Sequence, residues 1–165
     1  MERVALMVDQ FKHAEAELIS LSMPTVASVQ GHAAAAAGMA LALCHEYVLM
    51  RSGRGLMYMS EVDIGMSFLD CFSALFRAKV GSVPAQRAVL LGGAKVKGEE
   101  AVRMGTVDSA HGSEGELSEA TMRLGEELAK RKWDGEVYGE IRKKSLYPDL
   151  CNILGLDPVK VISKL

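Results

Sequence analysis

One carboxylate and one run of small residues are the parts of this sequence best suited to chemistry. Glu61 follows the apolar segment 56–59, where its carboxylate would be partly shielded from water, as suits a general base that acts on a carbon acid. Five consecutive alanines, residues 33–37, precede Gly38. If they open a helix, its first N–H groups lack intrahelical partners and can stabilise an oxygen that gains negative charge. Small side chains would let that oxygen approach closely.

The same residues also admit structural interpretations. Glu61 could cap or pair at the end of a strand, and the alanines could serve close helix packing. We interpret Asp63 as structural, because its side chain shares the direction of Glu61 only if the strand continues. His32 in the turn and His45 near the helix end, where a cation suits the dipole, are weaker candidates for chemistry.

Strands and one helix must position these groups. Residues 25–29 are strand-like and run into Gly31, and a buried helix is expected over about 35–45. Segments 47–50 and 56–59 predict short strands, the second of which delivers Ser60 and Glu61 at its end.

The remaining elements are predicted to be mostly helical. An amphipathic helix is expected over residues 2–21, with Glu15 among the polar positions between its apolar ones, and Pro24 follows its end. Further helices are expected over 67–80, 83–91, 99–104, about 113–132 and 137–146, with an extended piece at 106–108. Gly105 is expected to end one of these helices, and Ser113 with Glu116 predicts a capping box. We expect the helix ending at Leu146 to be the last.

Several motifs in order along the chain resemble one known family. They are residues 23–33 (MPTVASVQGHA), 58–65 (YMSEVDIG), 90–96 (LLGGAKV) and 99–108 (EEAVRMGTVD). This succession resembles the enoyl-CoA hydratase/isomerase (crotonase) superfamily, and within it the plant-type peroxisomal enoyl-CoA delta isomerases. The resemblance covers nearly the whole chain.

The resemblance implies an α/β fold, the crotonase-like ββα spiral followed by a helical C-terminal region. Family members usually carry further chain before the first helix, so we expect the spiral to be partial, with its N-terminal strands missing and sheet edges unpaired. The expected organisation is one domain over residues 1–165, with a spiral core over about 1–110 and C-terminal helices over 111–160.

The resemblance also implies a site. Glu61 falls on the base of the isomerases, and the backbone N–H of Ala37 is the expected oxyanion donor, with Gly38 beside it and Ala36 as the alternative because of an apparent one-residue insertion. The first glutamate of the hydratases corresponds to Ala40 or Met39, and neither can move a proton. We therefore expect isomerisation of a 3-enoyl-CoA to the 2-trans-enoyl-CoA. An inactive assembly subunit is the alternative, and a hydratase is a weaker one.

By the same resemblance the protein needs no metal or redox cofactor, takes coenzyme A as part of its substrate, and forms a trimer-type homo-oligomer. Composition agrees with an ordinary globular chain. The net charge is −2 without a basic stripe, which argues against nucleic acid, and no apolar run reaches membrane-spanning length. Three cysteines, odd in number and unclustered, suit a reducing compartment and argue against a zinc site.

The last three residues match a targeting signal. Ser163, Lys164 and Leu165 form the C-terminal tripeptide that the peroxisomal import receptor recognises. The sequence therefore predicts a peroxisomal location, with an exposed tail after Val161.

Overall fold

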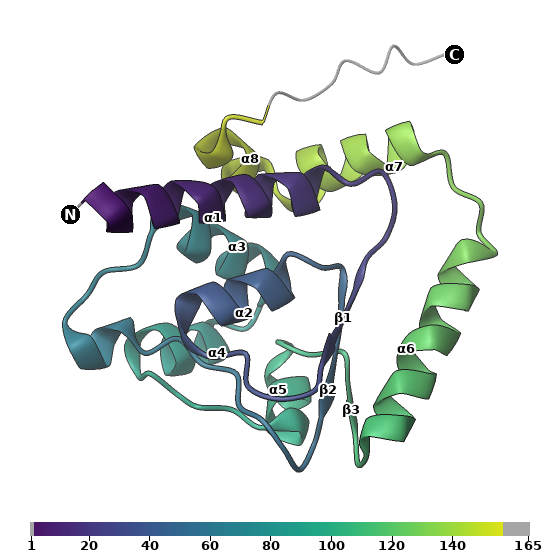
Figure 1. The fold of residues 1–165 in the computed structure, drawn as a ribbon, viewed down its shortest axis with the longest axis horizontal. Coiled ribbons are helices and arrows are strands. Elements are labelled where there is room, and N and C mark those ends of the chain that lie inside the picture. Colours follow the sequence, from purple (N-terminus) through teal and green to yellow (C-terminus); the bar gives the residue numbers. More distant parts are fainter. Residues whose placement is uncertain (1, 157–165) are drawn as a thin grey trace.

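The fold is built on a three-stranded parallel sheet with the strand order β1-β2-β3, seen in a computed structural model that describes residues 2–156 (Figure 1). The strands are β1 (Val26–Val29), β2 (Tyr47–Arg51) and β3 (Ser109–His111). Val26 pairs with Tyr47, and Leu49 pairs with Ser109. The middle of β2 is buried, as is usual for parallel strands with helices on both faces.

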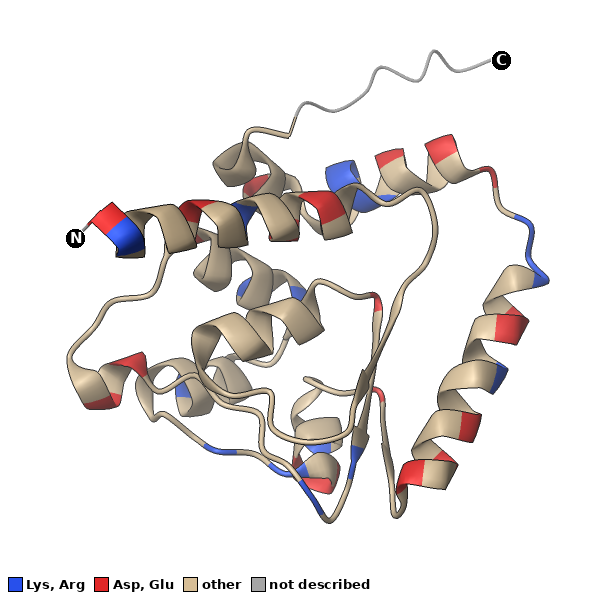
Figure 2. Cartoon of the chain, in the orientation of Figure 1, with Lys and Arg blue, Asp and Glu red and all other residues tan. Residues whose placement is uncertain are grey.

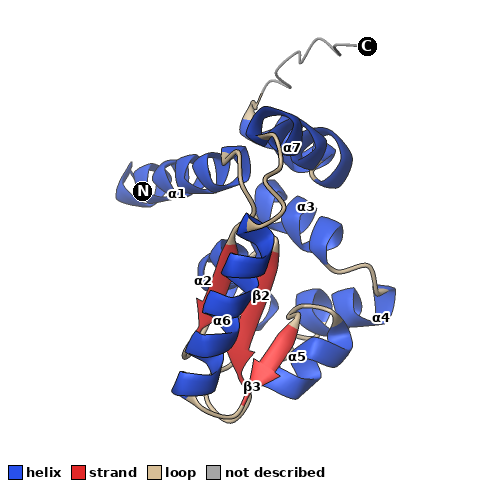
Figure 3. Cartoon of the chain, turned by 90° about the vertical axis from the view of Figure 1, so that its right-hand side faces the viewer, coloured by secondary structure: helices blue, strands red, loops and turns tan. Residues whose placement is uncertain are grey.

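Helices cover the two faces of this sheet (Figures 1 and 3). Val48 and Met50 of β2 belong to the main core, which includes side chains of α2 (Ala35–Leu43) and α3 (Asp70–Lys79). Leu49 points to the opposite face, where it packs with Leu117 and Ala120 of α6 (Glu114–Ala129). Alternate β2 side chains thus belong to two separate clusters, because successive side chains of a strand point to opposite faces.

The first helix and the last helices of the described residues pack together. Helix α1 (Glu2–Ser20) lies against η3 (Arg142–Leu146) and α8 (Pro148–Leu154), while α7 (Gly135–Ile141) continues directly into η3 (Figure 1). The other elements are η1 (Glu61–Ile64), α4 (Val83–Gln86), η2 (Arg87–Leu91) and α5 (Gly98–Met104).

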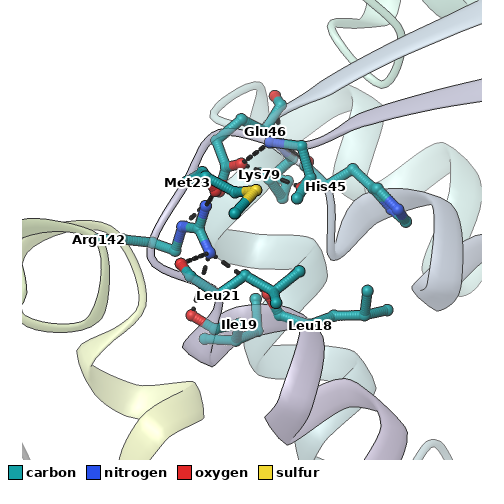
Figure 4. A network of polar contacts seen from close by, with 9 residues as sticks. Leu18, Ile19, Leu21, Met23, His45, Glu46, Lys79 and Arg142 are labelled. Atoms are coloured by element: carbon teal, nitrogen blue, oxygen red, sulfur yellow. Dashed lines mark hydrogen bonds and ion pairs between the residues drawn. The ribbon is translucent and has the colours of Figure 1, made fainter. Parts of the chain in front are cut away.

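Buried Arg142 joins these elements to the sheet (Figure 4). Its guanidinium donates to the carbonyls of Ile19 at 3.3 Å and Leu21 at 2.7 Å, at the end of α1. Its Nε lies 2.6 Å from Oε1 of Glu46, just before β2. The other oxygen of Glu46 accepts from the Thr25 N–H at 2.7 Å, just before β1. One ion pair therefore fixes both strand starts to the end of α1.

Most predicted helices are confirmed. The helices α1, α2, α3, α5 and α6 lie where their periodicity placed them, within a few residues. Gly105 ends α5 in the left-handed conformation with φ 73°, and Ser113 with Glu116 forms the capping box of α6. The helix predicted over 83–91 is present as α4 followed by η2.

Several predicted details are wrong. Segment 56–59 is not a strand, since Met57 makes only isolated bridges to Ala33 and Val96, and Glu61 begins the short helix η1. Strand β3 begins at Ser109, after the predicted extended piece 106–108, because Asp108 uses its carboxylate to accept from the β2 backbone. The prediction that the last helix ends at Leu146 also fails, because Pro148 starts α8. Glu15 is buried, not solvent-facing.

Over residues 2–156, no helix combines the length and apolar character that a membrane crossing requires. The predicted exposed tail and the tripeptide of Ser163, Lys164 and Leu165 lie outside the described residues. The single-domain division and the partial ββα spiral stay predictions.

Candidate active site

The site forms where β1 passes through a tight turn into α2. The Ala33 N–H donates to the carbonyl of Leu56 at 2.9 Å, which ties the turn to segment 56–59. Helix α2 carries no charged residue (Figure 2), and its N-cap residue, Ala34, makes no side-chain capping bond. Its first N–H groups therefore need partners from elsewhere in the chain.

Glu61 supplies such a partner from the first residue of η1. Its Oε1 accepts a hydrogen bond of 3.1 Å from the N–H of Ala36, 25 residues earlier in the sequence. Its Oε2 is buried and has no hydrogen-bond partner among the described residues. One oxygen of the carboxylate is thus bonded at the helix start, and the other makes no hydrogen bond within the described residues.

The predicted oxyanion residues lie beside this carboxylate in the first turn of α2. Ala36 is buried and its N–H is used by Glu61, whereas Ala37 is exposed. A Cβ on Gly38 would stand 3.1 Å from the carbonyl carbon of Ala33, so glycine lets the helix approach the turn. The structure therefore brings Glu61, Ala36, Ala37 and Gly38 together at one helix end.

Met39 and Ala40 belong to the hydrophobic core. Both are fully buried in the main core. The helix face that carries them packs against other side chains, and neither residue offers a second carboxylate near Glu61.

Two backbone features of the site were missed from the sequence. Gly55 has φ 102°, and a Cβ there would lie only 2.0 Å from the carbonyl oxygen of Gly31, so the two segments touch through main chain alone. Ala35, the first residue of α2, has φ 57°, which is unusual for a residue with a side chain. In the sequence, Gly55 follows Gly53 and Arg54, and this pattern predicts a turn but not its contact with Gly31.

The weaker candidates are exposed or are hydrogen-bonded to another residue. Asp63 is exposed, and its carboxylate faces Gly93, where a Cβ would meet it at 3.2 Å. His32 is exposed, and His45 donates from Nδ1 to the carbonyl of Leu41 at 2.9 Å near the end of α2.

The thiols of Cys44 and Cys71 are buried. Burial raises the pKa of Cys71 to about 12 and also raises the pKa of Cys44. Both are therefore protonated at neutral pH and are poor nucleophiles. In residues 2–156, no cluster of three or more His, Cys, Asp or Glu could hold a metal ion.

Comparison with known proteins gives a consistent result. The enoyl-CoA hydratase/isomerase family model matches residues 2–136. From Arabidopsis thaliana, peroxisomal enoyl-CoA delta isomerase 2 is 58% identical over 156 residues, which cover 94% of this chain and 64% of that protein. Enoyl-CoA delta isomerase 3 of the same plant is 56% identical over 157 residues, covering 94% and 65%. The chain thus spans just under two thirds of these relatives.

A solved structure shows the same fold. An enoyl-CoA hydratase/isomerase family protein from Pseudomonas syringae superimposes with a TM-score of 0.81 at 22% identity, over 98% of this chain and 70% of that one. The shared architecture at low identity, the matched family model and the two plant relatives lead to one conclusion: this chain belongs to the enoyl-CoA hydratase/isomerase family.

Proposed function

We propose that this chain isomerises a 3-enoyl-CoA to the 2-trans-enoyl-CoA, with Glu61 as the catalytic base. The observation that carries the proposal is the contact between the Glu61 carboxylate and the first turn of α2, at 3.1 Å from the Ala36 N–H. A base and a set of helix N–H groups side by side suit the removal of a proton next to a thioester carbonyl.

The reaction is balanced with one carboxylate. Glu61 takes a proton from C2 of the substrate, and the electron pair of that C–H bond moves into a dienolate whose oxygen accepts hydrogen bonds from helix N–H groups, including that of Ala37. The same carboxyl then returns the proton to C4, so that the double bond lies between C2 and C3. The chemistry calls for no metal or redox cofactor, and coenzyme A enters as part of the substrate.

A one-base reaction fits the surroundings of Glu61 better than hydration does. Addition of water to an enoyl-CoA needs one group to activate the water and another to handle the proton. The position that corresponds to the first glutamate of the hydratases holds Ala40 or Met39, and both residues are buried and apolar. The names of the Arabidopsis relatives, both enoyl-CoA delta isomerases, also support isomerisation.

The test is to follow the conjugated 2-enoyl product by its absorbance with wild type, Glu61→Gln and Asp63→Asn. We expect Glu61→Gln to reduce turnover by at least about 1,000-fold because the amide cannot accept the proton. Asp63→Asn is the matched control on the same short helix and should keep wild-type turnover. Wild-type rates in Glu61→Gln would disprove the assignment.

A second candidate is a non-catalytic assembly subunit. Strand β1 is an edge strand of the sheet as described, and an edge invites pairing with another chain. Folded wild-type protein that shows no turnover, yet binds a full-length relative, would favour this candidate. The trimer implied by the resemblance is tested by sedimentation, against the 17.8 kDa mass of one chain.

We also propose a peroxisomal location. Ser163, Lys164 and Leu165 match the tripeptide that the import receptor binds, and two enoyl-CoA delta isomerases of Arabidopsis thaliana to which the chain is similar are named as peroxisomal. A fluorescent protein fused ahead of this chain should enter peroxisomes, and deletion of Leu165 should leave it outside.

A further inference from the structure

Helix α2 has no means of capping its own N-terminus. Residues 33–37 are all alanine, and the N-cap Ala34 makes no side-chain bond. The Glu61 carboxylate is held there by a single hydrogen bond, from the Ala36 N–H to Oε1 at 3.1 Å. Its other oxygen, Oε2, is buried without a partner in the part of the chain that the structure describes.

We infer that the Ala36 N–H is a positioning group that holds Oε1 of Glu61, so that Oε2 carries the proton in the reaction while Glu61 also caps α2. The catalytic half of this inference rests on the proposed function, and the capping half does not.

In this inference, two N–H groups of the first helical turn have different roles: that of Ala36 holds the base, and that of Ala37 binds the substrate oxygen. The Ala36 N–H already donates to the base and is therefore a weaker donor to the substrate oxygen, so this inference assigns it to Glu61. Ala37, the next residue of the helix and an exposed one, then supplies the N–H for the dienolate oxygen. The fixed Oε1 restricts rotation of the carboxylate, and a fixed base is in place for both proton transfers.

Capping is tested by amide hydrogen exchange at Ala36 in three forms of the chain. Glu61→Gln keeps an acceptor oxygen and should leave exchange at Ala36 near the wild-type rate, whereas Glu61→Ala should speed it by about fivefold or more. Asp63→Ala serves as the control and should change nothing at Ala36. Equal exchange in wild type and Glu61→Ala would overturn the capping role.

Positioning is tested by replacing a backbone amide with an ester, which removes one N–H and leaves every side chain in place. An ester at residue 36 should lower kcat by about 10- to 100-fold with little change in KM, because the base loses its orientation. An ester at residue 37 should lower kcat by about 100- to 1,000-fold, as expected for loss of an oxyanion donor.

The two failures can be told apart. Wild-type kcat with the ester at residue 36 would overturn the positioning role even if Glu61→Gln is inactive. An inactive wild-type chain would instead refute the proposed function together with positioning. The exchange rates at Ala36 would still decide whether Glu61 caps α2.

Discussion

Ala35 has a backbone conformation that favours glycine. Its φ of 57° lies in the left-handed region, which costs a residue with a Cβ about 1 kcal/mol or more. We expect Ala35→Gly to raise the free energy of unfolding by up to about 1 kcal/mol, measured by urea denaturation.

The next exposed alanine of the same helix is the control for that prediction. Ala37 is not among the positive-φ residues, so Ala37→Gly should lower stability by up to about 1 kcal/mol. Equal effects of the two substitutions would show that Ala35 is not strained.

Glu15 makes stability depend on pH. Both carboxylate oxygens of Glu15 are buried between α1 and the core and have no hydrogen-bond partner among the described residues. Burial raises the pKa of Glu15 from 4.5 to about 7, and the neighbouring Cys71 thiol lowers this pKa by a smaller amount. The folded state therefore holds the proton more tightly than the unfolded state. The contribution of protonated Glu15 to stability is complete below pH 4.5 and is lost as the pH rises to about 7. The free energy of unfolding falls by about 3 kcal/mol at most over this interval.

Glu15→Gln should remove that loss. We expect its free energy of unfolding to stay flatter than that of wild type between pH 4.5 and pH 7, measured by urea denaturation across this interval. Glu17→Gln, a change of an exposed carboxylate on the same helix, should leave the wild-type slope intact. A wild-type slope in Glu15→Gln would contradict the prediction.

At the scale of elements, the ion pair of Arg142 with Glu46 joins α1, η3 and both strand starts. The Arg142 side chain is 1% exposed and that of Glu46 is 10% exposed, so removal of either partner leaves a buried charge. We expect Arg142→Met to lower the free energy of unfolding by about 3 to 5 kcal/mol. Thermal or urea unfolding would measure the loss.

A double substitution separates the buried charge from the packing. Arg142→Met with Glu46→Gln should recover part of the loss, because no carboxylate then remains unpaired. Arg123→Met on the exposed face of α6 should change stability by less than about 0.5 kcal/mol. A loss in Arg142→Met no larger than this would mean that the ion pair does not hold the elements together.

Local signals were enough to predict most elements, and contacts distant in sequence explain the errors. The capping box of α6 and the glycine at the end of α5 depend on residues within one turn. Segment 56–59 looked like a strand. Within it, however, Met57 forms one isolated bridge to Ala33 and another to Val96, and no strand is built. The burial of Glu15 depends on α1 packing, which helical spacing cannot reveal.

The candidate site was predictable in its residues but not in its bonding. Resemblance to a family pointed to Glu61 and to the start of α2. That the carboxylate bonds Ala36 in particular, with one oxygen left free, depends on how the chain places two segments 25 residues apart. The left-handed Ala35 has no signal in a run of identical alanines.

At the scale of the whole molecule, the sheet separates a large core from a small one. In the part of the chain that the structure describes, the second face carries a cluster of Leu49 with Leu117 and Ala120 of α6. We expect amides of α6 to exchange with solvent before those of α2 and α3, since fewer buried contacts hold that layer.

Leucine truncation on each face tests this. Leu117→Ala should cost about 2 to 5 kcal/mol and speed exchange mainly in α6, whereas Leu75→Ala in the main core should speed exchange throughout the described chain. Uniform exchange in both variants would show that the two layers open together.

The meeting of Gly55 with Gly31 limits how this protein can vary. At a contact between two backbone segments, no side chain can change its rotamer to make room for a substitution. A methyl group at residue 55 would overlap the carbonyl oxygen of residue 31. The two loops must therefore shift as a pair, whereas the exposed side chains of Val62 and Ile64 on η1 and of Met66 just after it can be exchanged one at a time. We expect sequences of this family to vary at such exposed side chains, and the two glycine loops to change only together.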